Sequence, residues 1–288
     1  MWNGFWPPGN ADDGAFRLEK STRLTQSIVL VGPSNFVSLT KESIRLLVGA
    51  SAQYTSRLAR SAEEIRAAQV LRFEIFNLEL NEGLPQSYTT GLDADPYDAV
   101  CDHLIVEHVP THKIVGTYRL QTGGNAMEKL GYYCAQEFDF GVYEPWRKEI
   151  VELGRACVHR QHRNLVVLGL LWKGIAAYAK ERGGRYLIGC SSLTSQDPVV
   201  GTAAYQELGR KNLAPAPWRT QPLPAYACPI DPQAGEHADI PKLLRAYLTI
   251  GAKICGPPAM DRQFKTIDFL TLLDIEKISA SARMRFLS

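Results

Sequence analysis

Residues 149–158 have the sequence EIVELGRACV, an apolar run that carries two opposite charges, Glu152 and Arg155. Such a run predicts a buried strand. Residues 165–182 follow with the length and apolar content of a long helix, and a pair of glycines directly after them marks its end. Residues 185–191 are apolar again and predict a second strand. This strand, helix and strand form the centre of the predicted fold.

The elements on both sides fit the same layered arrangement. Ser61-Ala-Glu-Glu64 has the spacing of a helix capping box and opens a helix that runs to about residue 80. The remaining pattern predicts a polar loop at 81–97, a hairpin of strands at 101–108 and 113–121, a helix at 199–208, a proline-rich loop at 220–236, a helix at 242–254 and a strand at 264–274. The expected fold class is α/β, in the layered α+β sense, with a mixed central sheet flanked by helices.

The expected organisation is one domain with additions at both ends. Residues 51–288 form this domain, and its C-terminal elaboration begins at about residue 220. Residues 1–50 form an irregular N-terminal extension. Within it, 41–49 predict either a helix or an amphipathic segment that lies on a membrane.

Composition limits the function classes. The net charge of +2 is too small to indicate a nucleic-acid-binding protein. No apolar run reaches the roughly 20 residues that span a bilayer, the first residues lack the pattern of a secretory signal, and the six cysteines form no Cys-x-x-Cys pair. These features predict a cytoplasmic protein with reduced thiols. If its substrate is a lipid, the protein meets the inner membrane only at its surface.

The loop before the hairpin is rich in carboxylates, because Asp93, Asp95 and Asp98 lie within six residues. Three carboxylates could hold an ammonium group. The loop also resembles a loose calcium loop, but it lacks the central glycine and the final glutamate of an EF-hand. A solvated acidic turn is the alternative without a function.

Glu152 and Arg155 are the next candidates. In a regular strand, two residues three positions apart point to opposite faces. Gly154 lies between them, and a bulge there would bring both side chains toward one cleft. A carboxylate in a cleft suits acyl transfer to an amine, because a base must take a proton from the amine. An internal salt bridge is the alternative.

Three segments in this order resemble the acyl-homoserine-lactone synthases. That family carries an arginine on its first long helix, then an E-x-D-x-x-D motif, then an arginine on a strand and an E-L-S-R motif. The matching residues are Arg72 on the helix, Asp93, Asp95 and Asp98 in the loop, Arg119 in the hairpin, and Glu152 and Arg155, with Gly154 in place of the serine. The resemblance covers roughly residues 61–191.

The tail, residues 251–274, resembles that of the hemolysin-like acyltransferases. The best-known members are bacterial ornithine N-acyltransferases of ornithine-lipid synthesis, which belong to the GCN5-related N-acyltransferase (GNAT) superfamily. The resemblance implies the fold of that superfamily. It also implies transfer of a long 3-hydroxyacyl chain from acyl carrier protein to the α-amine of L-ornithine, which gives lyso-ornithine lipid.

We expect the following roles for these residues. Glu152 would be the base, directly or through a water, and Arg155 would hold it in place. The three aspartates would bind the cationic substrate or order their loop, together with Arg72 and Arg119. Tyr205 lies in a stretch similar to the A-x-x-x-Y-x-x-x-G pattern of the superfamily. It would either protonate the departing thiolate or pack in the core.

The donor site departs from that of the superfamily's acetyltransferases. Those enzymes bind the pyrophosphate of coenzyme A with a Q/R-x-x-G-x-G/A stretch at a helix start, whereas residues 158–168 have bulky apolar residues in place of both glycines. The expected donor is a 4'-phosphopantetheine thioester on acyl carrier protein. Arg160, Arg163 and Lys173 would dock the acidic body of that carrier. We expect no permanently bound cofactor and no metal.

Alternatives remain open. An N-acyl amino-acid synthase, or a signal synthase of the acyl-homoserine-lactone type, would use a different amine acceptor. A non-catalytic lipid-binding protein could have the same fold, although it would not need Glu152 and Arg155. Cys157 lies beside the candidate cleft, but no spacing predicts the paired base that a cysteine nucleophile requires.

Overall fold

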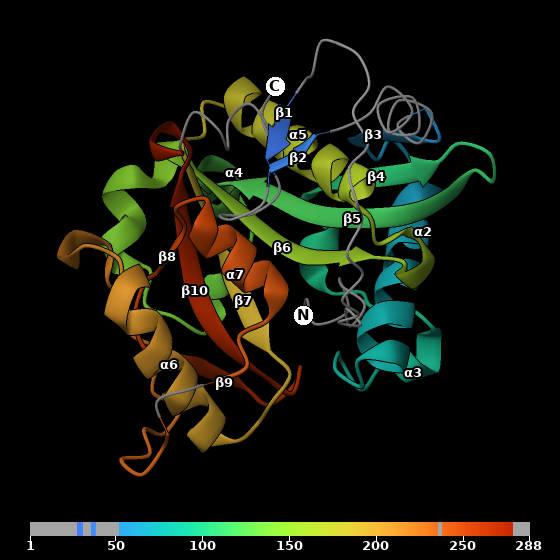
Figure 1. Ribbon diagram of the computed structural model, residues 1–288. Coiled ribbons are helices and arrows are strands. Elements are labelled where there is room, and N and C mark those ends of the chain that lie inside the picture. Colours follow the sequence, from blue (N-terminus) through green and yellow to red (C-terminus); the bar gives the residue numbers. More distant parts are fainter. Residues whose placement is uncertain (1–27, 31–35, 39–51, 236–237, 279–288) are drawn as a thin grey trace, which may run out of the picture.

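The computed structural model describes residues 28–30, 36–38, 52–235 and 238–278. Its centre is one mixed sheet with the strand order β3-β4-β5-β6-β7-β10-β8, to which the short β9 is added beside β10 (Figure 1). The strands are β3 (Tyr54–Leu58), β4 (Asp102–His108), β5 (Lys113–Thr122), β6 (Ile150–Val158), β7 (Tyr186–Leu193), β8 (Lys253–Ile254), β9 (Ala259–Asp261) and β10 (Thr266–Asp274). A separate antiparallel pair consists of β1 (Ile28–Leu30) and β2 (Phe36–Ser38).

Helices flank the sheet, so the predicted fold class is confirmed. They are α2 (Ala62–Phe73), which continues as a π-helix at Glu74–Glu79, α3 (Ser87–Thr90), α4 (Gly123–Glu128), α5 (Leu165–Glu181), α6 (Pro198–Asn212) and α7 (Lys242–Thr249). The predicted cap is present, because the Ser61 hydroxyl accepts a hydrogen bond from the amide of Glu64. No helix of the described ranges is long and apolar enough to cross a membrane.

The helix predicted over 242–254 is shorter than expected. It ends at Thr249, because Gly251 adopts a φ of +110°, a conformation that terminates helices. Residues 253–254 then form β8 instead. Most of the predicted extension at 1–50, including the segment at 41–49, lies outside the described residues.

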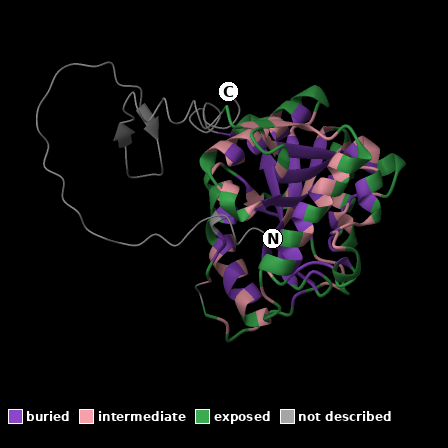
Figure 2. Cartoon of the chain, turned by 90° about the vertical axis from the view of Figure 1, so that its right-hand side faces the viewer, coloured by how far each residue is buried: buried purple, intermediate pink, exposed green. Residues whose placement is uncertain are grey.

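The two faces of the sheet are covered by different layers. Along β7, Leu187 packs into a cluster with α5 and α7, whereas the next residue, Ile188, packs into a cluster with residues 126–143. Side chains alternate in the same way along β10, as expected for a sheet that is buried on both faces. Figure 2 shows the strands buried at the centre and the outer helix surfaces exposed.

β6 and β7 run parallel and separate partway along their length. Their pairing ends at Glu152 opposite Ile188, although β6 continues to Val158 and β7 to Leu193. At the point of separation a Cβ atom on Gly189 would lie only 2.3 Å from the carbonyl oxygen of Leu153, so only glycine permits this approach. Beyond this point the two strands leave room for a cavity.

A bulge interrupts β6 directly after this point. Thr117 of β5 pairs with Cys157, but Arg119 pairs with Gly154, so β6 has one extra residue. The bulge predicted at Gly154 is confirmed, but the left-handed backbone falls on Arg155, whose φ is +47°. This conformation costs a non-glycine residue roughly 1–2 kcal/mol. The contacts of the Arg155 side chain, described below, offset that cost.

Candidate active site

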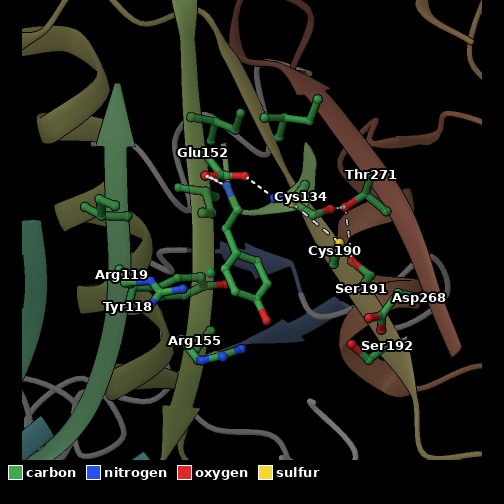
Figure 3. Close-up of a pocket in the computed structure, with 18 of the residues that line it drawn as sticks. Tyr118, Arg119, Cys134, Glu152, Arg155, Cys190, Ser191, Ser192, Asp268 and Thr271 are labelled. Carbon is green, nitrogen blue, oxygen red and sulfur yellow. Dashed lines mark hydrogen bonds between the residues drawn. The ribbon is translucent and has the colours of Figure 1, made fainter. Parts of the chain in front are cut away.

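The gap between β6 and β7 opens into a cavity with about 950 Å³ of empty space, including the open solvent at its mouth. Two of its walls face each other across the sheet (Figure 3). Arg119, Glu152 and Arg155 come from β5 and β6, whereas Cys190, Ser191, Ser192, Asp268 and Thr271 come from β7 and β10. Toward α5 and α7 the lining is more apolar and includes Trp172, Leu187, Ala252 and Leu273.

Glu152 is held as a pure hydrogen-bond acceptor. Its carboxylate accepts the side-chain amide of Gln121 at 2.5 Å, the main-chain amide of Tyr133 at 2.9 Å and that of Cys134 at 2.8 Å. Only 4% of Glu152 is exposed. Three donors fix both oxygens and leave one lone pair on Oε1, which can accept a proton inside the cavity.

The predicted bond between Arg155 and Glu152 is absent from the described structure. Arg155 instead pairs with two aspartates of the acidic loop, with its Nε 3.3 Å from Asp93 and its Nη2 3.0 Å from Asp95. The bulge turns the guanidinium toward this loop, and Glu152 is already satisfied by amides. Arg155 therefore holds the loop, and these contacts give no support to its predicted role as the holder of Glu152.

The acidic loop is a buried ion network and not a solvated turn. Asp98 lies 2.6 Å from Arg72 and 3.1 Å from Arg119, and Arg119 also lies 2.6 Å from Asp95. Arg72 is fully buried and closes the network with a 2.8 Å contact to Asp93. Every predicted aspartate is thus paired with arginine. The geometry supports the expectation that these residues order the loop, and it leaves none of them as a free anion for a substrate.

Charge explains how the network tolerates burial. Burial alone raises the pKa of Asp98, but the guanidinium groups of Arg72 and Arg119 outweigh it and lower the pKa. The pKa of Asp95 is also lowered, because Arg119 and Arg155 outweigh its burial. These carboxylates stay ionised in the folded protein.

Tyr133 is a cavity residue that sequence reasoning missed. Its ring lies 5.1 Å from the guanidinium carbon of Arg119 and 4.8 Å from that of Arg155. Its main-chain amide also binds Glu152. Tyr133 therefore connects the ion network to the candidate base. Nothing in the local sequence marks it, because it lies in an irregular segment.

Tyr205 lies apart from this site. It is on α6, where it packs partly buried against an apolar cluster that includes Leu193 and Leu208. It is not among the residues that line the cavity. The cavity contains other tyrosines, Tyr118 and Tyr247, whose hydroxyls lie 2.5 Å apart on the side of α5 and α7. The position of Tyr205 gives no support to its expected role as the acid.

The three predicted docking residues differ in their surroundings. Arg160 and Lys173 are exposed. Arg163 instead forms an ion pair with Glu79 at 2.5 Å and donates to the carbonyl of Val158, and only 10% of its side chain is exposed. Arg163 is therefore a structural residue that joins β6 to the helix after α2.

A second acidic group lines the cavity and was also missed. Glu137, Asp261 and Asp268 are 3%, 6% and 2% exposed. Glu137, Cys190 and Asp268 have potential ligand atoms within 4.8 Å of one another, which makes them the only such group found in the described ranges that could share a metal ion. Three histidines lie close together elsewhere, with 4.8 Å between the ring centroids of His108 and His162 and 5.5 Å between those of His159 and His162.

Comparisons with known proteins agree with this architecture. The acetyltransferase (GNAT) domain family matches residues 71–173. The structure of FeeM, an N-acyl amino acid synthase from uncultured soil microbes, is similar in fold, with a TM-score of 0.50 and 12% identity over 80% of this chain and 96% of that one.

Curated relatives match over most of their length. The L-ornithine N(alpha)-acyltransferase of Agrobacterium fabrum is 31% identical over 89% of this chain and 92% of its own length. The enzyme of the same name from Rhizobium meliloti is 34% identical over 81% of this chain and 84% of its own length. Together with the cavity between β6 and β7, these matches show that the chain belongs to the L-ornithine N(alpha)-acyltransferase family, acyltransferases with the GNAT fold that join an acyl donor to an amine acceptor.

Proposed function

We propose that this protein transfers an acyl chain from the thioester of acyl carrier protein to the α-amine of L-ornithine. The observation that carries the proposal is the Glu152 carboxylate, fixed by three donors in the cavity between β6 and β7. The names of the curated relatives supply the acceptor.

The reaction is a direct attack. The neutral α-amine adds to the thioester carbonyl carbon, the new C–N bond forms, the C–S bond breaks, and the thiolate leaves. Glu152 accepts the proton that the amine loses, directly or through a water. Main-chain amides on the edge of β6 beyond Glu152, where pairing with β7 has ended, are candidates to stabilise the carbonyl oxygen. The apolar walls toward α5 and α7 suit the acyl chain.

The start of α5 favours a carrier protein over coenzyme A. The amides of Val166 and Val167 both donate to the side chain of Asn164, at 3.0 Å each. A pyrophosphate at this helix start would need those amides, but the chain's own cap occupies them. An acyl carrier protein holds the pantetheine arm on its own surface, so it does not need a pyrophosphate site at the start of α5.

The test is a reaction of the purified chain with acyl carrier protein that carries a 3-hydroxyacyl group, together with ¹⁵N-labelled ornithine and a panel of other amino acids. We expect Nα-acyl ornithine as the main product by mass spectrometry, and a much higher kcat/KM with the carrier protein than with the same acyl-coenzyme A. If another amino acid is acylated in preference to ornithine, that amino acid is the acceptor and the proposed acceptor is wrong. Equal kcat/KM values for the two donors would refute the carrier-protein donor.

A further inference from the structure

The acidic group of Glu137, Asp261 and Asp268 has no function in the mechanism above. The three residues come from distant parts of the chain. Glu137 follows the short 3₁₀ turn Cys134–Gln136, Asp261 ends β9, and Asp268 lies in the neighbouring strand β10, opposite Ser192 of β7. All three line the same cavity as Glu152.

These carboxylates differ from those of the acidic loop in their ion pairs. None of the three forms an ion pair with a lysine, arginine or histidine anywhere in 52–235 or 238–278. Glu137 Oε2 and Asp268 Oδ1 are buried and accept no hydrogen bond there. Asp261 is partly satisfied, because its Oδ1 accepts the amides of Gln263 and Phe264. A buried, unsatisfied carboxylate is costly unless a ligand supplies a donor.

Repulsion between these carboxylates affects the pKa values of Glu137 and Asp268. Burial raises the pKa of Glu137, and the nearby carboxylates of Asp268 and Asp261 raise it further. Burial also raises the pKa of Asp268, and Asp261 adds to this rise. A cation bound between Glu137 and Asp268 would oppose both rises in pKa.

We propose that Glu137, Asp261 and Asp268 bind the side-chain ammonium of the acceptor, and so select an amino acid with a second positive charge. This inference rests on the proposed function. An ammonium group carries three donors and no acceptor, which suits three carboxylates with free lone pairs. The group thus takes the place of the acidic loop as the site for the cationic end of the substrate.

Geometry connects this group to the reacting amine. The amide of Cys134 binds Glu152, and Glu137 lies three residues further along a 3₁₀ turn. At a rise of about 2 Å per residue, the backbone of Glu137 lies roughly 6 Å from that of Cys134, the residue whose amide binds Glu152. The two nitrogens of ornithine are five bonds apart, which is also about 6 Å in an extended chain. One acceptor molecule can therefore place its α-amine near Glu152 and its side-chain ammonium near Glu137.

A metal ion is the competing occupant. Cys190 would have to bind such an ion as a thiolate, but its thiol donates to the sulfur of Cys134 at 3.5 Å. That contact and burial raise the pKa of the Cys190 thiol well above its usual value. Without a thiolate from Cys190, the two carboxylates of Glu137 and Asp268 suit an ammonium group better than a metal ion.

The test compares ornithine with norvaline, which has the same carbon chain but no side-chain ammonium. The wild-type protein should prefer ornithine by roughly 10²-fold or more in kcat/KM, because norvaline leaves the buried carboxylates without a partner. Glu137→Gln and Asp268→Asn should lower this preference at least tenfold, because the KM for ornithine rises while the kcat/KM for norvaline rises or stays the same. Asp274→Asn is the matched control, since Asp274 is also on β10 but pairs with Arg185 outside the cavity.

Each outcome separates the two proposals. If the wild-type protein does not acylate ornithine, the proposed function fails. If it does so but both variants keep the wild-type preference over norvaline, only the assignment of the acidic group fails. Calorimetry in buffers of different ionisation enthalpy should show proton release on ornithine binding by the wild-type protein, and less in Asp268→Asn. One equivalent of a divalent metal in the purified protein, lost in Asp268→Asn, would overturn the ammonium assignment.

Discussion

The guanidinium of Arg155 lies between the acidic loop and the cavity, and its position determines which carboxylates a substrate can meet. It contacts Asp93 and Asp95 on one side, and the rings of Tyr133 and Phe264 lie 4.8 Å and 4.1 Å from its guanidinium carbon. The loop is thereby neutralised and covered. The anions that remain for the acceptor are Glu152 and the group of Glu137, Asp261 and Asp268.

Glu152→Gln tests the base at the scale of one residue. The amide keeps the size of the side chain but loses basicity, so kcat should fall by about 10²–10⁴-fold. The variant should also unfold at a lower temperature, because its NH₂ group must face at least one of the three donors that now bind the carboxylate. Steady-state kinetics and thermal unfolding measure the two effects. Activity should partly recover near pH 9, where the amine loses its proton unaided.

Gln121→Leu is the control for this variant, because it removes one donor and keeps the carboxylate. Gln121→Leu should be less stable than the wild-type protein, but it should lose far less activity than Glu152→Gln does. A wild-type kcat in Glu152→Gln at neutral pH, or an equal loss of kcat in both variants, would remove Glu152 as the base.

Asp98→Asn tests the buried network. Asp98 contacts Arg72 and Arg119, and the loss of one partner from a buried ion pair costs about 3–5 kcal/mol. Because the pKa of Asp98 is lowered in the folded state, its stabilisation is complete above the unfolded pKa of about 3.9 and is lost as the pH falls toward the folded pKa. The difference in the free energy of unfolding between wild type and variant should therefore be constant from pH 8 to 5 and shrink below pH 4.

Urea unfolding at each pH measures this difference, and Glu128→Gln, an exposed carboxyl on α4, is the control. A difference that stays constant down to pH 3 would show that Asp98 does not stabilise the fold through its charge.

At the scale of the elements, the separation of β6 from β7 creates the cavity. Parallel pairing ends at Glu152, the bulge at Arg155 turns β6 away, and β7 continues beside β10 through Leu193. Glu152, the proposed base, therefore lies at the last paired position, and the cavity begins at the next residue. A rigid support of this kind is what precise positioning of a base requires.

Gly189→Ala tests this point of separation. Its Cβ would lie 2.3 Å from the carbonyl oxygen of Leu153, so the strands must shift where the cavity begins. We expect a loss of about 1–3 kcal/mol of stability, as for other overpacked sites, and a loss of kcat. Gly169→Ala on α5 is the control, because its Cβ would meet no atom within 4 Å and alanine favours a helix. Wild-type kinetics and stability in Gly189→Ala would contradict this account.

At the scale of the whole molecule, the sequence was most informative where neighbours in the chain are also neighbours in space. The bulge could be predicted because Glu152, Gly154 and Arg155 are adjacent. The pairing of Arg155 with Asp93 could not, because it depends on how a strand and a loop about 60 residues apart meet. The acidic group could not be predicted for the same reason, because β9 and β10 bring Asp261 and Asp268 to Glu137 from more than 120 residues away.

The proposed docking of an acyl carrier protein would use the outer surface, and the burial of the basic residues shows which of them to test. The sequence between residues 155 and 220 carries ten basic and three acidic side chains. Several of these cations are used inside the molecule, since Arg163 pairs with Glu79 and Arg185 with Asp274. Arg160 and Lys173 are exposed, and they are the better candidates for an acidic partner.

The double variant Arg160→Glu and Lys173→Glu should raise the KM for the acyl carrier protein at least tenfold, with little change in kcat at saturating donor. The effect should be largest at low salt, because surface electrostatics are screened within about 8–10 Å at physiological ionic strength. Arg163→Glu should instead destabilise the fold by placing a negative charge beside Glu79. Titration of the carrier protein at several salt concentrations, together with thermal unfolding, separates the two effects. An unchanged KM in the double variant at low salt would mean that the carrier protein docks on another surface, even if Glu152 and the acidic group keep the roles proposed for them.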